Sequence, residues 1–214
     1  MFALSENSRL REAICRFGHL LYMRGYAHGS SGNISARTDD GIIVTPTNSC
    51  LGLLDPAQLS SVASDGKHIS GDPPSKEAFL HLSMYRERPG ARGIVHLHCT
   101  HAVAVSCLCH EDPSNVLPPL TAYYAMRIGK LPLIPYFRPG DRALAEAVRE
   151  QARTHNAVLL ANHGPVVAGR TLEDAVFSAE ELEETAKLSL LLEGQPQSLL
   201  TAEQLAELQS AFPN

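Results

Sequence analysis

The chain has 214 residues, of which 44% are hydrophobic and 19% charged, and its formal net charge is −5. These values are ordinary for a soluble globular protein with a sizeable core, and they exclude a largely disordered chain. No apolar run approaches the roughly 18 residues that span a bilayer, and no basic stripe with interleaved aromatics is present, so we expect neither a membrane nor a nucleic-acid partner.

The N-terminal residues and the cysteines both indicate the cell compartment. Residues 1–6 lack the basic-then-apolar pattern of a secretion signal, so we expect a cytoplasmic protein. The five cysteines are odd in number and show no Cys-x-x-Cys spacing. We therefore expect buried free thiols in a reducing compartment.

The first half of the chain predicts one helix followed by short strands. Apolar residues recur at helical spacing after Leu10, and Gly25 offers a stop. A glycine- and serine-rich turn follows at 29–33, and Asp65-Gly66 is a favoured two-residue hairpin turn. The expected elements are a helix over 10–21, a strand from 34, a strand over 41–45, and a hairpin of 59–64 with 67–70.

The second half alternates helices and strands without a regular repeat. The expected elements are helices over 76–86, 100–107, 141–154 and 172–192, strands over 93–98, 131–136, 157–161 and 165–168, and a C-terminal helix from Thr201 with a Thr-x-x-Gln capping pattern. This mixed order predicts one α/β domain over residues 1–214, with three α/β/α layers and a largely antiparallel central sheet. The final helix is interpreted as a separate packing arm.

Three histidines indicate a metal site. His96 and His98 lie two apart in an apolar run, and the period of a strand would place both rings on one face. His163 follows another apolar run beside Gly164, where a loop could present it to the same point. Two nearby imidazoles and a distant third are the ligands of an open zinc site. A lone histidine on such a strand would more often be a hydrogen-bonded core residue.

The remaining histidines lack this context. We interpret them as helix-surface or loop residues, although His101 lies close enough to the pair to support it. They are His19, His28, His68, His81, His101, His110 and His155.

Glu77 is the candidate carboxylate of this site. It falls near the start of a predicted helix, where the helix dipole favours an anion. If this turn faces the histidines, Glu77 could complete the metal shell and then move a proton once substrate displaces it. The alternative is an ordinary glutamate at a helix start.

Three short segments supply hydrogen-bond donors suited to a phosphate. Each is weak alone, because glycine, serine and asparagine fill ordinary turns. Lys76 is the informative member, since a cation in the first turn of a helix opposes the dipole unless an anion is bound. The candidate phosphate residues are Ser31, Asn33, Thr47, Asn48, Ser75 and Lys76.

In combination these segments resemble the class II aldolase family of fuculose-phosphate aldolases and ribulose-phosphate 4-epimerases. The resemblance runs from about residue 8 to 193. Its motifs are Ser31-Gly32-Asn33, Thr45-Pro46-Thr47, Ser75-x-Glu77, His96-x-His98 and Asn162-His163-Gly164.

The resemblance implies a three-layer fold and a homotetramer with active sites between subunits. It implies one divalent ion per subunit, usually Zn²⁺ with Mn²⁺ or Co²⁺ possible, held by His96, His98 and His163. Glu77 would be both a resting ligand and the acid/base group. Tyr123 matches a tyrosine that donates a proton in a neighbouring subunit's site.

Two residues depart from the aldolase pattern, and the second of them narrows the expected substrate. Asn48 stands where aldolases commonly have glycine, and asparagine tolerates a positive φ better than most residues. Lys76 stands where they have a small hydroxyl residue, which points to a more anionic substrate. Four stretches are similar to the decarboxylases of 3-oxo-tetronate 4-phosphates: 24–30, 45–52, 71–77 and 138–141.

The resemblance therefore implies a lyase that converts a small phosphorylated oxo-acid to dihydroxyacetone phosphate and carbon dioxide through a metal-stabilised enediolate. Two alternatives stay open. One is sugar-phosphate aldol cleavage or 4-epimerisation, and the other is a non-catalytic binding protein like the adducin relatives of the family.

Overall fold

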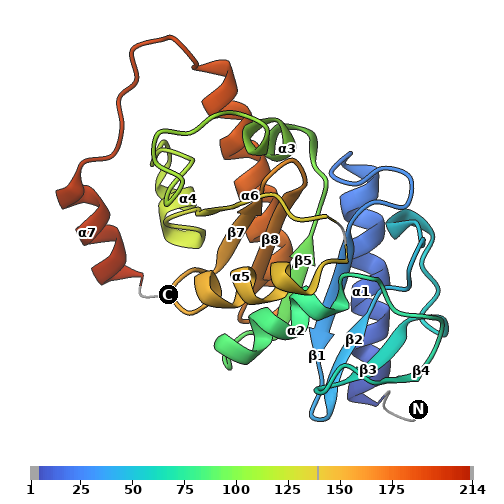
Figure 1. Cartoon of the computed structure of the whole chain (residues 1–214). Helices are drawn as coiled ribbons and strands as arrows, with labels where there is room; N and C mark the ends of the chain where they lie inside the picture. Colours follow the sequence, from blue (N-terminus) through green and yellow to red (C-terminus); the bar gives the residue numbers. More distant parts are fainter. Residues whose placement is uncertain (1–4, 139, 213–214) are drawn as a thin grey trace.

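The computed structural model describes residues 5–138 and 140–212, and Figure 1 follows the chain through it. Residues 1–4, on which part of the localisation expectation rests, and Pro139 of the 138–141 stretch lie outside the described residues. In the part described, one eight-stranded sheet has the order β4-β3-β2-β1-β5-β8-β7-β6. Its strands pair antiparallel except for β6 and β7, which are parallel.

The strands are short and the helices vary from one turn to five. The strands are β1 Asn33–Arg37, β2 Gly41–Val44, β3 Ser60–Ala63, β4 His68–Ser70, β5 Gly93–His96, β6 Leu133–Ile134, β7 Ala157–Leu160 and β8 Gly164–Gly169. The helices are α1 Glu6–Met23, α2 Ala78–Glu87, α3 Thr100–Ser106, α4 Ala122–Arg127, α5 Arg142–Ala152, α6 Leu172–Leu191 and α7 Ala202–Ala211, with a 3₁₀ turn η1 at Leu51–Leu53.

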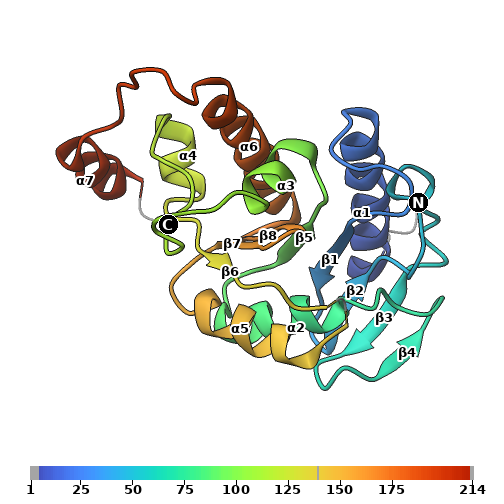
Figure 2. The same cartoon turned by 45° about the horizontal axis from the view of Figure 1, so that its top comes forward.

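Helices cover both faces of the sheet, as Figure 2 shows, so the expected three α/β/α layers are confirmed. The period of two decides which residues of a strand face which layer. In β5, Val95 packs with α1, α3, α4 and α6, whereas Ile94 packs with α2 and α5. Each face of the sheet thus has its own apolar core.

Several element boundaries differ from the sequence expectation. The first helix begins at Glu6, capped by Ser5, because polar residues occupy its first turn before the apolar spacing starts. The strand expected over 131–136 is only Leu133–Ile134. The helices α4 and η1 had no periodic signal, since each is too short to show one.

The expected caps at Asp141 and Thr201 are both present, and Thr201 makes the full capping box with Gln204. The helix that Thr201 starts, α7, packs beside α4 and has no buried residue, in keeping with an arm. None of the described helices combines the length and apolarity that crossing a membrane requires.

The five cysteines are free, as expected, but only Cys99 is fully buried. Cys107 and Cys109 are exposed, because the chain leaves α3 at Ser106 and runs over the surface.

Candidate metal centre

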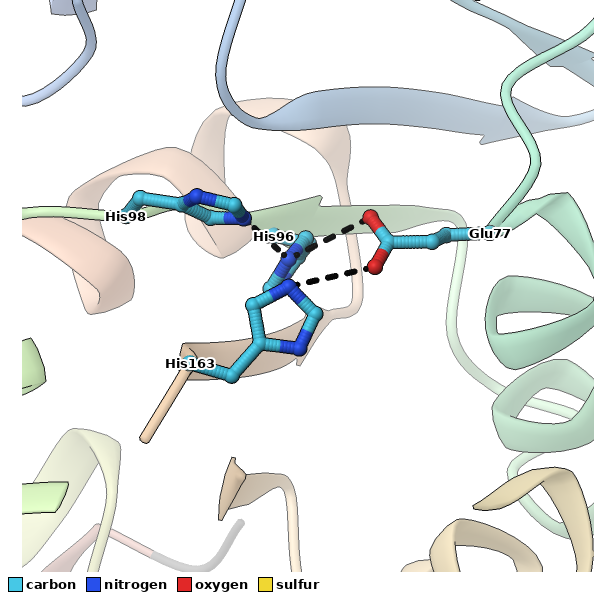
Figure 3. A group of neighbouring side chains, drawn as sticks. All are labelled: Glu77, His96, His98 and His163. Atoms are coloured by element: carbon cyan, nitrogen blue, oxygen red, sulfur yellow. Dashed lines mark hydrogen bonds and ion pairs between the residues drawn. The ribbon is translucent and has the colours of Figure 1, made fainter. Parts of the chain in front are cut away.

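Four side chains converge at one end of the three central strands β1, β5 and β8 (Figure 3). Glu77, His96, His98 and His163 each offer one ligand atom, and all four atoms lie within 4.8 Å of one another. His96 Nε2 is 3.0 Å from His98 Nε2 and 3.4 Å from Glu77 Oε2, and His163 Nε2 is 3.2 Å from Glu77 Oε1. The structure therefore brings together the four residues that the sequence selected as ligands.

These separations fit a divalent ion. A tetrahedral ion with bonds of about 2.0–2.1 Å keeps its ligand atoms about 3.4 Å apart. Three imidazoles and a carboxylate are also the donor types that zinc and similar ions prefer. The cluster is a group able to bind a divalent metal.

His96 is the most buried of the four residues in the cluster. It is the last residue of β5, where the strand pairs with Asn33 of β1 and Val166 of β8. Its Nδ1 lies 2.8 Å from the carbonyl oxygen of Pro165, which can only accept, so Nδ1 carries the proton. Nε2 is then left with a lone pair directed at the centre of the cluster.

His163 reaches the cluster from the tight β7–β8 connection. Asn162 has φ of 56°, a left-handed conformation that asparagine tolerates, and its N–H donates to the Ser106 carbonyl. A Cβ on Gly164 would lie 2.2 Å from the carbonyl oxygen of Leu97. The chain beside His163 can therefore approach the chain beside His98 only because residue 164 has no side chain.

His98 lies beyond the end of β5, which stops at His96, and not within the strand as expected over 93–98. The short helix α3 follows two residues later, and Glu183 of α6 holds its start. The Glu183 carboxylate accepts from the N–H groups of His101 and Ala102 and is 2.8 Å from His101 Nδ1. His101 therefore binds Glu183, and within the described residues none of its hydrogen bonds reaches the cluster, contrary to the supporting role considered for it.

Burial favours the neutral form of the His96 and His98 rings. It lowers the pKa of His96, and burial together with the neighbouring imidazoles lowers the pKa of His98 to about 3. Neutral rings are the form that binds a metal, since a protonated nitrogen has no lone pair to give.

Glu77 stays ionised despite its burial. Burial raises the pKa of the carboxyl group, but the hydrogen bonds from His163 and from the amide of Asn33 favour the ionised form, and the pKa lies far below its usual range. Asn33 Nδ2 donates to Glu77 Oε2 over 2.8 Å, and the Glu77 N–H donates to Ser75 Oγ. Glu77 is the N-cap residue of α2, which begins at Ala78, so the helix starts two residues later than expected.

His81 corrects one sequence expectation. It was interpreted as a surface or loop residue, but it is completely buried on α2. Its Nε2 lies 2.6 Å from Asn33 Oδ1 and its Nδ1 lies 2.6 Å from Ser35 Oγ. The apolar helix around it gave no sign of these partners, which come from β1.

Two of the candidate phosphate segments lie side by side. The Thr47 N–H donates to the Pro73 carbonyl, and the Ser75 N–H donates to the Thr45 carbonyl. An isolated bridge also joins Pro46 to Pro74. The loop that carries Thr47 and Asn48 is thereby held against the loop that carries Ser75 and Lys76.

Within these loops Asn48 has φ of 56°, the left-handed conformation expected of it, and Lys76 is exposed. Ser31 lies in the turn before β1 and donates its hydroxyl hydrogen to the His28 carbonyl. Asn33 is more buried than a phosphate contact requires, and its amide is already bonded to Glu77 and His81.

Tyr123 lies away from the cluster on its own chain. It is on α4, its side chain is 64% exposed, and it lines a surface cavity of about 730 Å³ together with Arg127 and Phe212. The role of Tyr123 in a neighbouring site stays a prediction.

The chain is similar to one known protein family and to individual proteins of known activity. The family described as "Class II Aldolase and Adducin N-terminal domain" matches residues 12–190. A curated relative from Escherichia coli K12, the 3-oxo-tetronate 4-phosphate decarboxylase, is 51% identical over 98% of this chain and 99% of its own length. A relative from Methanocaldococcus jannaschii, the L-fuculose phosphate aldolase, is 38% identical over 83% of this chain and 92% of its own.

A solved structure agrees with these matches. It is that of YgbL from Escherichia coli, described as a putative aldolase/epimerase/decarboxylase, with a TM-score of 0.93 and 49% identity. The alignment covers 96% of this chain and 100% of the other. The resemblance predicted from the motifs is confirmed.

The buried His81 generates a prediction about acid stability. Burial lowers its pKa from 6.5 to about 3. Between these values the unfolded chain binds a proton that the folded chain does not, so stability falls as the pH falls. From pH 6.5 to pH 5 this histidine should remove about 2 kcal/mol of unfolding free energy.

In chelator-treated protein, the variant His81→Gln should therefore lose about 2 kcal/mol less than the wild type between pH 7 and pH 5. Urea unfolding at the two pH values measures this, with His68→Gln as the control for the same change at an exposed histidine. Parallel losses in wild type and His81→Gln would contradict it.

Proposed function

The chain belongs to the class II aldolase and adducin N-terminal domain family, and we propose that it decarboxylates a 3-oxo-tetronate 4-phosphate to dihydroxyacetone phosphate and carbon dioxide. The observation that carries the proposal is the complete cluster of three histidines and Glu77, in a chain that is 51% identical from end to end to a decarboxylase of this kind. An intact ligand set also argues against a non-catalytic, adducin-like role.

The proposed substrate suits this reaction chemically. Its carboxylate is attached to the carbon next to a ketone, so when that bond breaks the electron pair can move onto the ketone oxygen. Carbon dioxide leaves, and the remaining enediolate takes a proton at C2 to become the product. A divalent ion would act as a Lewis acid toward the negative charge on the enediolate oxygens. We propose that this ion is Zn²⁺, with Mn²⁺ or Co²⁺ as alternatives.

The chain's own residues would orient the substrate and move the proton. The amide of Asn33 is already bonded to Glu77 and His81, so the phosphate would be held by Ser31 and by Thr47, Asn48, Ser75 and Lys76, whose two loops are hydrogen-bonded to each other. Such anchoring keeps the breaking bond in a fixed position relative to the cluster. Glu77 is ionised and less buried than His96, so it would take up a proton from water and deliver that proton to C2 of the enediolate.

We further propose that the single catalytic domain assembles as a homotetramer in which Tyr123 donates a proton at a neighbouring subunit's site. Its exposure and its distance from its own cluster suit a role across an interface. The assembly would work in the cytoplasm, since a charged phosphate ester does not cross a bilayer unaided.

The first prediction from the proposed function concerns the products and the metal. Purified protein given a 3-oxo-tetronate 4-phosphate should release equal amounts of carbon dioxide and dihydroxyacetone phosphate, and a chelator should abolish the release until zinc is restored. Full activity in metal-free protein would reject the mechanism. An aldehyde product from a ketose phosphate, or an inverted stereocentre, would favour the aldolase or epimerase alternative, which the 38% identical relative supports.

The second prediction concerns Glu77. The variant Glu77→Gln keeps the size and the hydrogen-bond acceptor of the side chain but removes the base. It should retain the fold and lower kcat by about 100-fold or more, in the range that general acid–base catalysis supplies. Circular dichroism and steady-state kinetics measure the two effects. A fully active variant would reject the proton role alone.

The third prediction concerns Lys76. The variant Lys76→Met should raise KM about tenfold or more with little change in kcat, because a charge-assisted bond to a phosphate strengthens the binding of substrate and transition state alike. Lys67→Met is the matched control, since Lys67 is an exposed lysine in the turn between β3 and β4. Equal KM values for the two variants would exclude Lys76 from the pocket.

A further inference from the structure

A buried row of polar side chains leads from Glu77 into the layer between β1 and α2. Starting at the carboxylate, Asn33, His81, Ser35 and Tyr85 are each hydrogen-bonded to the next, over 2.6–3.0 Å. All four are buried, in contrast to the half-buried Glu77. Of these four residues, only Asn33 is hydrogen-bonded to a member of the ligand cluster.

The row follows from two sequence periods that face each other. Glu77, His81 and Tyr85 are four residues apart, so they share one face of α2 and its N-cap. Asn33 and Ser35 are two apart in β1, so they share the face opposite to that of Ile34. Arg37 closes the row, with its guanidinium 4.5 Å above the Tyr85 ring centre.

The direction of every bond in the row can be deduced. A carboxylate only accepts, so the Asn33 amide presents Nδ2 to Glu77 and Oδ1 to His81. His81 Nε2 must then carry the proton that it donates to Oδ1. Because burial keeps His81 neutral, its Nδ1 has a lone pair and accepts the Ser35 hydroxyl hydrogen.

The Tyr85 hydroxyl donates to the Ser35 carbonyl oxygen over 3.1 Å and lies 3.0 Å from Ser35 Oγ. Because the Ser35 hydrogen is already given to His81, these two oxygens share the one hydrogen of Tyr85. Every donor in the row therefore points toward Glu77. Aligned bonds polarise one another, so the row places a positive end against the carboxylate.

This order prevents rotation of the Asn33 amide. If the amide turned over, its NH₂ group would meet the N–H of His81 and its oxygen would meet the ionised carboxylate of Glu77. Both contacts would be repulsive, and both buried groups would lose a partner. Glu77 and His81 together thus determine which end of Asn33 faces the cluster.

We propose that His81 is a positioning residue that acts through Asn33 to hold Glu77 in its productive orientation, with Ser35 and Tyr85 fixing the ring in turn. The inference rests on the proposed function, in which Glu77 both completes the ligand cluster and moves a proton. When the Glu77 carboxylate leaves the cluster and returns, its hydrogen bond from Asn33 Nδ2 brings it back to the same position.

The test compares two amide replacements of His81. The amide nitrogen of glutamine reaches the position of Nε2 and can still donate to Asn33, whereas the shorter asparagine reaches only the position of Nδ1. His81→Asn should weaken zinc affinity or lower kcat by about 10- to 100-fold at unchanged KM, as expected for a partner behind a metal ligand. His81→Gln should stay within about threefold of the wild type, the difference that incomplete mimicry of the ring allows.

Zinc affinity is measured without substrate, by competition with a chromophoric chelator, and thermal unfolding checks that both variants fold. Equal losses in His81→Gln and His81→Asn, or wild-type affinity and kcat in both, would overturn the proposal. Because this measurement needs no turnover, it stands even if the substrate proves to be a different one.

A second comparison covers the case in which His81→Asn does not fold. Tyr85→Phe removes the donor at the far end of the row, and Tyr124→Phe removes a buried hydroxyl that has no hydrogen-bond partner among the described residues. Tyr85→Phe should weaken zinc affinity or lower kcat about threefold, less than a direct partner of Asn33. Tyr124→Phe should leave both unchanged, and equal effects of the two variants would overturn the proposal.

Nitrogen-15 spectra of the metal-free wild type test the bond directions themselves. His81 should show a neutral ring with its proton on Nε2. A proton on Nδ1, or on both nitrogens at pH 7, would overturn the assigned order.

Discussion

The site depends on the antiparallel pairing of three central strands, which brings distant segments of the chain to one point. β1 and β5 pair so that Asn33 lies opposite His96, and β5 and β8 pair so that His96 lies opposite Val166, two residues after Gly164. Adjacent strands are only about 4.8 Å apart, so side chains at their ends meet without long loops. The ligand atoms of residues 77, 96, 98 and 163 can therefore share one point.

The two faces of the sheet contribute differently to this arrangement. The face toward α1, α3, α4 and α6 is packed with apolar side chains such as Val95 and Leu97. The face toward α2 admits a polar row, because β1 presents Asn33 and Ser35 there and α2 presents His81 and Tyr85. Buried polar groups are tolerated when each has a partner, and such a network allows few alternative packings.

Much of the cluster could be predicted from sequence, because the signals were local. The spacing of His96 and His98 and the position of Glu77 before a helix are visible within a few residues. His81 could not be recognised that way, since its partners lie more than forty residues earlier in the chain. The matching periods of Glu77, His81, Tyr85 and of Asn33, Ser35 were a usable signal, but only once α2 is known to pack on β1.

The fold class followed from the order of elements, whereas the short elements did not. Helices of one or two turns, such as α4, carry too few residues for a hydrophobic period, and tertiary contacts decide where they begin. The strand expected to contain His98 ends two residues earlier, because Glu183 draws the following residues into the start of α3. What sequence could not supply was therefore mainly the effect of contacts between distant segments.

The close approach at Gly164 restricts how this centre can be altered, whether by natural drift or by an engineer. With the Leu97 carbonyl oxygen only 2.2 Å from where a first side-chain carbon would stand, no other amino acid fits unless the backbone moves. Any redesign of substrate selectivity would have to leave that hairpin untouched and work through the loops around Asn48 and Lys76, which face solvent and have room to vary.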